Sequence, residues 1–363
     1  ALRALGVEVS ALADLAKLPV LRKAELSERQ KAEPPFGGLT VGPVTHVFQS
    51  PGPIYEPGSL QGDWFRMGRF LNAAGIGAGD VVQNCFGYHL TPAGHMFESG
   101  ALAVGARVLP AGTGQTELQV TAARDVVATA YAGTPDYLKI ILEKADEMGV
   151  ALGITKAAVG GGALFPSLRE WYSARGIACL QCYATADLGN VAYESPAMEG
   201  MILDEGVIVE IVTPGTGDPV ASGEVGEVVV TALNPDYPLL RFATGDLSAF
   251  MDGSRPCGRT NKRIKGWMGR ADQTTKIKGM FVRPEQVAAL VAQHEEVSKA
   301  RVIASRAGEQ DQLTVLIESG GGDAARYAAS VASVLKMKGA VEIHAPGSLP
   351  KDGLVIEDQR TYE

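Results

Sequence analysis

The chain has few cysteines and no long apolar run. Four cysteines in 363 residues (Cys85, Cys179, Cys182 and Cys257) are too few and too scattered for a disulfide framework. Cys179 and Cys182 have the spacing of a zinc or redox pair but no second ligand pair, so buried apolar cysteines in a strand are the preferred alternative. No apolar run is long enough to span a bilayer, and no basic-then-apolar leader opens the chain. We therefore expect reduced thiols, no membrane partner and a cytoplasmic location.

Basic residues are also fewer than acidic ones: 33 Lys and Arg against 41 Asp and Glu give a formal net charge of −8. This excess of acid argues against a nucleic-acid partner. A local exception is the segment from Arg255 to Arg283, where nine basic residues accompany the single acid Asp272. It is either a solvated surface run or a segment that attracts a multiply phosphorylated ligand such as ATP or coenzyme A. Lys276 and Lys278 are its candidate cofactor-binding lysines.

The length and composition predict a folded protein of two domains. A single core rarely extends beyond about 250 to 300 residues, and 46% hydrophobic residues with 20% charged residues exclude disorder. From about Ser59 to Cys182, short apolar runs alternate with amphipathic ones, which predicts a mainly parallel sheet covered on both faces. We expect helices over Ser59–Ala74, Thr91–Val104, Pro135–Met148 and Ser167–Ala174, and strands over Val81–Phe86, Arg107–Leu109, Ala128–Ala132, Lys156–Val159 and Ala178–Cys182.

The pattern changes after Glu194. Val207–Val212 and Val225–Thr231 flank a turn-rich segment and predict antiparallel strands of a β subdomain. Beyond Asp272, we expect a helix from Pro284 and a further helix near Ala324–Lys338. The expected strands are a short first one, two near Ala300–Ala304 and Leu313–Glu318, and a last one at Val341–His344. The predicted fold is α/β: a large N-terminal domain (1–271) of mixed sheets flanked by helices plus the antiparallel β subdomain, and a small, mobile α+β C-terminal domain (272–363).

Two runs carry the most specific signal. Arg241–Leu247 (Arg-Phe-Ala-Thr-Gly-Asp-Leu) is followed by Gly269–Gly279 (Gly-Arg-Ala-Asp-Gln-Thr-Thr-Lys-Ile-Lys-Gly) near the start of the last 90 or so residues. With these runs, the chain resembles the phenylacetate-CoA ligase branch of the adenylate-forming acyl-CoA ligases. Further matching segments are Leu12–Pro19, Gly133–Tyr137, Gly226–Thr231, Gly269–Pro284 and Gly347–Pro350.

The resemblance implies a reaction. It implies an ATP-dependent carboxylate–CoA ligase that acts on an aryl or arylacetic acid through an acyl-adenylate. The implied cofactors are ATP or AMP, Mg²⁺ and coenzyme A, and the implied partner is a small, aromatic carboxylic acid. Whether the protein forms a homodimer is left open.

Asp246 and Arg270 are the expected nucleotide contacts. Asp246 ends a strand-like run after Thr-Gly, a turn that would direct its carboxylate outward to two ribose hydroxyls. A turn-capping aspartate is the alternative. Arg270 can bind a phosphate or ribose oxygen through its planar guanidinium, and Asp272 resembles the family's interdomain hinge. A plain surface turn is the alternative for this segment.

The segment from Tyr183 to Asp187 follows a predicted strand, at the sheet edge where ligands collect. The resemblance places Tyr183 and Ala184 beside the adenine, a hydroxyl on phosphate and an acid on Mg²⁺. Here Ala186 stands at the hydroxyl position, so Thr185 is the candidate substitute. Asp187 is the candidate metal ligand, one methylene shorter than the family's glutamate.

Glycines follow another predicted strand end. Gly160, Gly161 and Gly162 have no Cβ and would let a planar base approach the backbone. The family carries an acid at the position of Gly162, so one polar contact is missing here.

The segment from Asn84 to His89 is the expected wall of the acyl pocket. Phe86 and Tyr88 suit a flat aromatic ring, and His89 and Tyr137 complete the predicted substrate contacts. His89 and His95 have no third ligand nearby in the sequence, so a structural or pocket-lining role is preferred over a metal.

Two positions depart from the family. A Ser/Thr/Gly-rich loop ending in Lys-Pro would wrap the ATP phosphates. This chain instead has Gln49–Pro57, with three prolines and with Glu56, which would repel phosphate. The lysine that assists adenylation would follow Gly353, yet Leu354 stands there, and Lys351 lies three residues out of register. The alternative function is therefore a catalytically impaired homologue that binds nucleotide or acyl-CoA.

Overall fold

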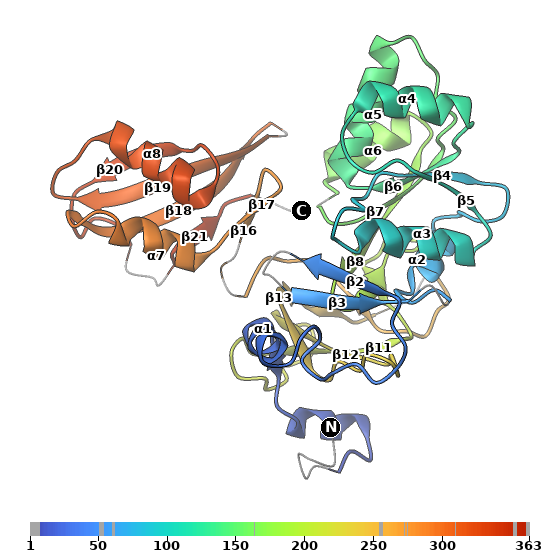
Figure 1. The fold of residues 1–363 in the computed structure, drawn as a ribbon, viewed down its shortest axis with the longest axis horizontal. Coiled ribbons are helices and arrows are strands. Elements are labelled where there is room, and N and C mark those ends of the chain that lie inside the picture. The colour runs from blue at the N-terminus through green and yellow to red at the C-terminus, as the bar shows by residue number, and fades with distance from the viewer. Residues whose placement is uncertain are drawn as a thin grey trace. The chain divides into compact units, whose positions relative to one another are not determined.

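The computed structural model describes most of the chain. The described residues are 8–50, 54–59, 62–162, 164–253, 257–271, 273, 275–308, 310–350 and 354–360. They form two compact units, which Figure 1 shows as a ribbon. The first unit comprises Ala1–Thr244 and Ser248–Trp267, and the second comprises Gly245–Leu247 and Met268–Glu363. The predicted boundary and hinge at Asp272 stay predictions, because Asp272 lies outside the described residues.

A nine-stranded sheet forms the centre of the first unit. Five of its strands run parallel, and β8 turns into antiparallel pairing with β9. Every residue of β4 and β6 is buried, as expected for strands that are covered on both faces. In spatial order the strands are β14 (Phe250–Met251), β15 (Arg263–Ile264), β10 (Met201–Leu203), β9 (Gly189–Tyr193), β8 (Ala178–Thr185), β7 (Lys156–Val159), β6 (Ala130–Gly133), β4 (Val81–Asn84) and β5 (Arg107–Pro110).

Helices pack on this sheet through two separate cores. Phe70 and Phe97 belong to one core, and Val120, Ile141 and Tyr172 belong to the other. Prolines at the first turn begin α5 and α6. The predicted parallel sheet with two covered faces is confirmed. The helices are α2 (Met67–Ala73), α3 (Ala93–Ala103), α4 (Thr116–Asp125), α5 (Pro135–Glu147) and α6 (Pro166–Ala174).

One helix prediction in this region needs correction, and one helix was missed. The helix expected from Ser59 begins only at Met67, because Arg66 has the left-handed φ of 61° and interrupts regular helix geometry. The carboxylate of Asp63 accepts hydrogen bonds from the amides of Met67 and Gly68, which would otherwise be unpaired in the first turn. Helix α4 was not predicted.

A second sheet and a hairpin complete the first unit. The expected antiparallel pair is confirmed as β11 and β12. Helix α1 is tied to the hairpin because the side-chain amide of Gln30 exchanges two hydrogen bonds with the backbone of Tyr55. The elements are a 3-10 helix (Leu12–Lys17), β1 (Leu21–Arg22), α1 (Lys23–Ala32), the hairpin β2 (His46–Ser50) and β3 (Ile54–Gly58), β11 (Val207–Val212), β12 (Gly226–Ala232) and β13 (Phe242–Ser248).

The second unit is an α+β module with its own core. Its four-stranded sheet has the order β20-β19-β18-β21, and Val302, Val315, Tyr327 and Val331 are fully buried in its core. The strand expected to be the last, near His344, is followed by β21. The elements are β16 (Thr275–Ile277), β17 (Met280–Val282), α7 (Pro284–Ala292), β18 (Val297–Ala307), β19 (Gln310–Ser319), α8 (Ala324–Leu335), β20 (Ala340–His344) and β21 (Ile356–Asp358).

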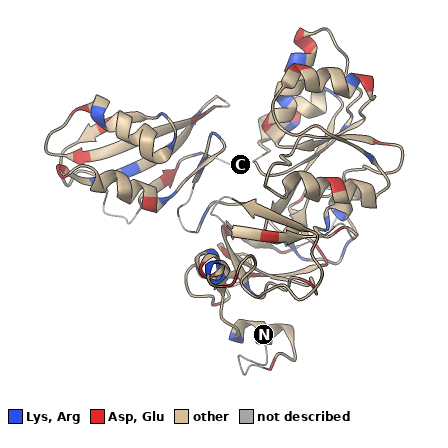
Figure 2. Cartoon of the chain, viewed as in Figure 1, with Lys and Arg blue, Asp and Glu red and all other residues tan. Residues whose placement is uncertain are grey.

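Charged residues are interspersed over the helices and loops of both units, as Figure 2 shows. The basic segment is not a uniformly solvated run. Arg259 pairs with Glu205 at 3.0 Å, and the buried Arg263 lies 3.5 Å from Glu199. Among the described residues, no helix has the length and hydropathy needed to cross a bilayer.

Candidate functional site

The parallel strands end at one edge of the nine-stranded sheet, and several predicted site residues follow these ends. Strands β4, β6 and β7 end at Asn84, Gly133 and Val159. Phe86 follows β4, is buried and stacks on Phe97 with 4.2 Å between ring centroids. A Cβ built on Gly161, after β7, would lie 3.7 Å from Phe86. The structure therefore brings the glycine run and the predicted aromatic wall together.

The three glycines of this run have different surroundings. A Cβ on Gly160 would lie 2.9 Å from Cys182 Sγ, so glycine is needed there for packing. Gly161 has a φ of 69°, which a side chain would strain. Gly161 and Gly162 are exposed, whereas Gly160 is buried. Only Gly161 and Gly162 keep the open edge that a planar base would need.

The predicted acyl-pocket residues do not all meet. Tyr88 accepts a hydrogen bond of 2.8 Å from Asn84 Nδ2 and lies edge-on to His95 at 5.2 Å. Tyr137 donates to the carbonyl of Gly114 at 2.8 Å. His89 is exposed, and no contact of its side chain with the others is seen among the described residues.

Histidine and cysteine show no sign of metal binding in the part of the chain that the structure describes. Burial lowers the pKa of His95 below its ordinary value, and the charge of His46 acts in the same direction. Cys179 and Cys182 are buried free thiols in β8, and burial raises the pKa of Cys179 to about 12. No group of three or more His, Cys, Asp or Glu side chains among these described residues has the arrangement to hold a metal.

Tyr183, Ala184 and Thr185 lie inside β8, not after it. The expected strand ends at Cys182, but the ladder to β9 continues to Thr185. The ring of Tyr183 is buried in a hydrophobic core. The hydroxyl of Thr185 accepts a hydrogen bond from the amide of Leu188 at 3.2 Å, so it stabilises the following turn.

Asp187 lies in the turn between β8 and β9, where its side chain is completely buried. Lys23, at the start of α1, forms an ion pair with Asp187 at 2.9 Å. Nothing in the sequence singles out Lys23, since the contact joins segments that are far apart in the chain. Oxygen is the donor that Mg²⁺ prefers, and Asp187 Oδ1 has no hydrogen-bond partner among the described residues. Asp187 therefore fits a magnesium ligand.

Glu56, on β3, is a second buried acid beside Asp187. Burial and then the charge of Asp187 raise the pKa of Glu56 to about 8. Ser50 donates a hydrogen bond of 2.5 Å to Glu56. Burial favours the neutral form of Glu56, so its repulsion of phosphate should be weaker than that of an ionised carboxylate. The hairpin of β2 and β3 was not predicted from the sequence.

Asp246 and Arg270 meet in the second unit. Asp246 was expected in a turn, but it lies within β13 and is only 9% exposed. The strand continues because the segment after Met268 pairs with it, through hydrogen bonds from Leu247 to Gly269 and from Ala271 to Gly245. Arg270 Nη1 donates to Asp246 Oδ1 at 2.9 Å. The two motifs that contain Asp246 and Arg270 are therefore in direct contact in the structure.

The remaining predicted residues are either exposed in the second unit or outside the described part of the chain. Leu354 is 37% exposed, and its carbonyl accepts a hydrogen bond from Arg301 at 3.1 Å. Lys276 and Lys278 are exposed on the hairpin of β16 and β17, with the ammonium of Lys276 5.9 Å from the Phe281 ring centroid. Lys351 and Asp272, both predicted to be catalytic, lie outside the described residues.

Solved structures share this fold. A structure of 2-hydroxyisobutyryl-CoA ligase in complex with 2-HIB-AMP and CoA aligns with a TM-score of 0.76 at 24% identity, covering 97% of this chain and 82% of that one. The amide bond synthetase McbA from Marinactinospora thermotolerans aligns with a TM-score of 0.59 at 18% identity, covering 89% and 71%. The chain therefore has the fold of the adenylate-forming acid ligases.

Sequence comparison gives the family. A phenylacetate-coenzyme A ligase of Thermus thermophilus is 30% identical over 85% of this chain and 72% of its own length. Those of Aromatoleum evansii and Escherichia coli are 29% and 30% identical, over 86% and 85% of this chain and 73% of each relative. No family model matches the chain. The chain belongs to the phenylacetate-CoA ligase family.

Proposed function

We propose that the protein is an ATP-dependent carboxylate–CoA ligase, which forms an acyl-adenylate and then a CoA thioester. The curated relatives at 30% identity are phenylacetate-coenzyme A ligases, and the solved 2-hydroxyisobutyryl-CoA ligase holds an acyl-AMP and CoA. The contact between Asp246 and Arg270 carries the proposal, because it joins the two motifs that the family uses for nucleotide. An aromatic acid is proposed as the substrate because Phe86 lies at the sheet edge.

The proposed roles follow the chemistry of each side chain. Asp246 would accept hydrogen bonds from the ribose hydroxyls, and Arg270 would bind a ribose or phosphate oxygen. Tyr183, Ala184 and Thr185 are proposed to lie beside the adenine and phosphate, and Lys276 and Lys278 would meet the phosphates of ATP or coenzyme A. Asp187 would hold Mg²⁺, which when bound offsets charge at the phosphates.

The second half of the proposal concerns the C-terminal unit. We propose that it moves about Asp272 between the two steps, and that Lys351 lies near the reacting groups. Its separate hydrophobic core supports an independent body. A homodimer is a possible oligomeric state, which a molar-mass measurement in solution would test.

The alternative is an impaired homologue that binds nucleotide or acyl-CoA without adenylating an acid. Leu354 cannot supply the positive charge of the lysine that is expected there. The segment Gln49–Pro57 lacks the lysine and most of the hydroxyls that are expected of the family's phosphate loop. Pyrophosphate release with a panel of aromatic acids distinguishes the two functions. Release with at least one acid supports the ligase, and nucleotide binding without release supports the alternative.

The ribose role of Asp246 predicts a loss of affinity. Asp246→Ala should weaken ATP and AMP binding at least tenfold, about 1.4 kcal/mol, because two ribose hydroxyls lose their acceptor. Isothermal titration calorimetry measures both affinities. The control is Asp252→Ala, an exposed aspartate nearby in the chain, which should bind like the parent. Equal affinities of the parent and Asp246→Ala would refute the assignment.

The domain junction predicts a protease-sensitive site. The chain passes from the first unit to the second at Trp267 and Met268, and few contacts protect a junction between domains. Limited trypsin digestion should cut between Gly266 and Lys276 before it cuts either core, and mass spectrometry would identify the fragments. Persistent resistance of this segment, with and without ligand, would contradict a mobile unit.

A further inference from the structure

The peptide unit that joins Leu354 to Val355 is held at both of its polar ends. Its carbonyl accepts a hydrogen bond from Arg301 Nε at 3.1 Å, and its N–H donates to the side-chain oxygen of Gln273 at 2.8 Å. The same oxygen of Gln273 also accepts from the amide of Ile356 at 3.3 Å. Because the C=O and N–H of a planar trans peptide point in opposite directions, Arg301 and Gln273 hold this unit from opposite sides.

Arg301 is a buried cation on β18, with only 3% of its side chain exposed. Besides the carbonyl of Leu354, its guanidinium donates to the carbonyl of Pro350 at 3.4 Å and to the carboxylate of Glu357 at 3.1 Å. A buried ion pair adds little net stability by itself, because both charges lose their hydration. Since these bonds all go to residues near position 354, Arg301 is placed to fix this part of the chain.

Gln273 connects the same peptide unit to the start of the second unit. It directly follows Asp272, the expected hinge residue, and it lies 82 residues from Val355 in the sequence. Its φ is 58°, in the left-handed region that few residues other than glycine adopt. Such conformations persist where surrounding contacts hold them, and they cluster at functional sites. The backbone at position 354 is therefore tied to the residue after the expected hinge.

These contacts fix the backbone at position 354, while the side chain there is 37% exposed. The chain after it is also held, because β21 begins at Ile356 and pairs with β18 (Figure 1). The family resemblance implies a lysine at position 354, and a catalytic cation is effective only when it is held accurately against the developing charge. A fixed backbone with an exposed side chain is the arrangement that such a residue needs.

We propose that Gln273 and Arg301 are positioning residues for the adenylation step, because they hold position 354 in a fixed place relative to the residue after the hinge. A rotation at Asp272 then moves position 354 and Gln273 as one body, and the side chain at position 354 reaches the same place in every cycle. The inference rests on the ligase function proposed above. It extends that function from the residues that would contact substrates to two that act through position 354.

Hydrogen exchange measured by mass spectrometry tests the clamp without any need for activity. Gln273→Ala should speed the exchange of the amides of Val355 and Ile356 about tenfold, because both lose their acceptor. Gln273→Glu keeps an acceptor oxygen and should exchange like the parent. The matched control is Gln293→Ala, an exposed glutamine of the same unit, which should leave these amides unchanged. Equal protection of the two amides in Gln273→Ala and the parent would overturn the clamp.

Pyrophosphate exchange in the Leu354→Lys background tests the positioning role. Adding Gln273→Ala should lower kcat about tenfold and leave the KM for ATP unchanged, because the lysine is misplaced while the nucleotide contacts stay. Adding Gln273→Glu instead should keep most of the rate. Arg301→Lys retains the buried charge but lacks the planar fork of the guanidinium, so it should lower kcat in the same way.

The outcomes separate the clamp from the ligase function. Loss of amide protection in Gln273→Ala with an unchanged kcat in the Leu354→Lys background would overturn the positioning role and leave the ligase function intact. A Leu354→Lys variant that binds ATP but shows no pyrophosphate exchange would count against the ligase function and would overturn the positioning role with it. The hydrogen-exchange result would still decide whether Gln273 holds the peptide unit.

Discussion

Leu354→Lys is expected to raise the rate of acyl-adenylate formation on the order of a hundredfold, because a cation near the developing charge can contribute a few kcal/mol. The family resemblance implies a lysine at this position, and the leucine of this chain cannot supply the charge. Leu354 is 37% exposed, so a lysine there keeps its ammonium in water and should not disturb the core. Exchange of labelled pyrophosphate into ATP, with an aromatic acid present, measures this step.

A neutral variant separates charge from shape in this experiment. Leu354→Gln is polar and of similar length but carries no charge, so it should remain as slow as the parent. Thioester formation from a supplied acyl-adenylate should change much less, because the proposed movement of the C-terminal unit removes this position in the second step. If the lysine variant binds ATP but gains nothing in exchange, the altered segment Gln49–Pro57 has already abolished adenylation, and the impaired homologue should be preferred.

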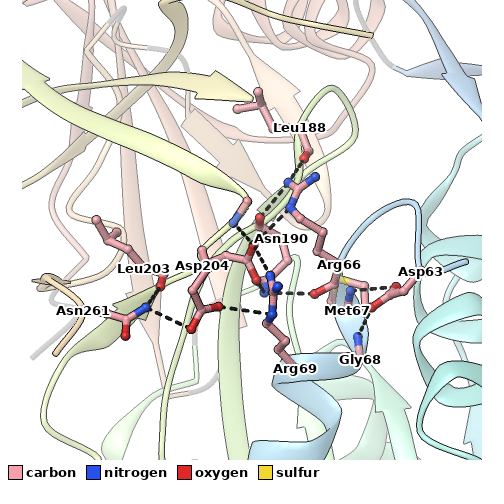
Figure 3. A network of polar contacts seen from close by, with 12 residues as sticks. Asp63, Arg66, Met67, Gly68, Arg69, Leu188, Asn190, Leu203, Asp204 and Asn261 are labelled. Atoms are coloured by element: carbon pink, nitrogen blue, oxygen red, sulfur yellow. Dashed lines mark hydrogen bonds and ion pairs between the residues drawn. The ribbon is translucent and has the colours of Figure 1, made fainter. Parts of the chain in front are cut away.

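Asp204→Ala is expected to destabilise the first unit by about 3 to 5 kcal/mol, the usual cost of leaving a buried charge without its partner. Asp204 is 1% exposed and pairs with Arg66 at 3.1 Å and Arg69 at 3.0 Å. Figure 3 shows both arginines directed toward it, with Asn190 on the same network. Burial also lowers the pKa of Arg66, which the charge of Asp204 counteracts.

Urea denaturation followed by circular dichroism measures this loss of stability. The matched control is the neighbouring Glu205→Ala. Glu205 pairs with Arg69 at 3.2 Å and Arg259 at 3.0 Å, but its side chain is 41% exposed, so water screens these pairs. Its loss should cost no more than about 1 kcal/mol. Similar losses for both variants would show that Asp204 has no special structural role.

Local patterns in the sequence predicted much of the fold. The alternation from Val81 to Cys182 predicted the parallel sheet, because strands buried on both faces are short and apolar while their helices are amphipathic. Proline at the first turn marked the start of α5. Helix α4 was missed because its first turn begins after Gln115, a residue in the left-handed region without a usual capping side chain.

The sequence by itself determined the family, the two-unit organisation expected from its length and motifs, and the absence of a lysine at Leu354, because each depends on residue identity and order. The tertiary structure alone decided which charges meet. Lys23, Glu56 and Asp187 are far apart in the chain, and only the packing of α1 and the hairpin brings them together. Burial then decides their chemistry, because an ionised carboxylate loses its hydration there and must gain a proton or a cation.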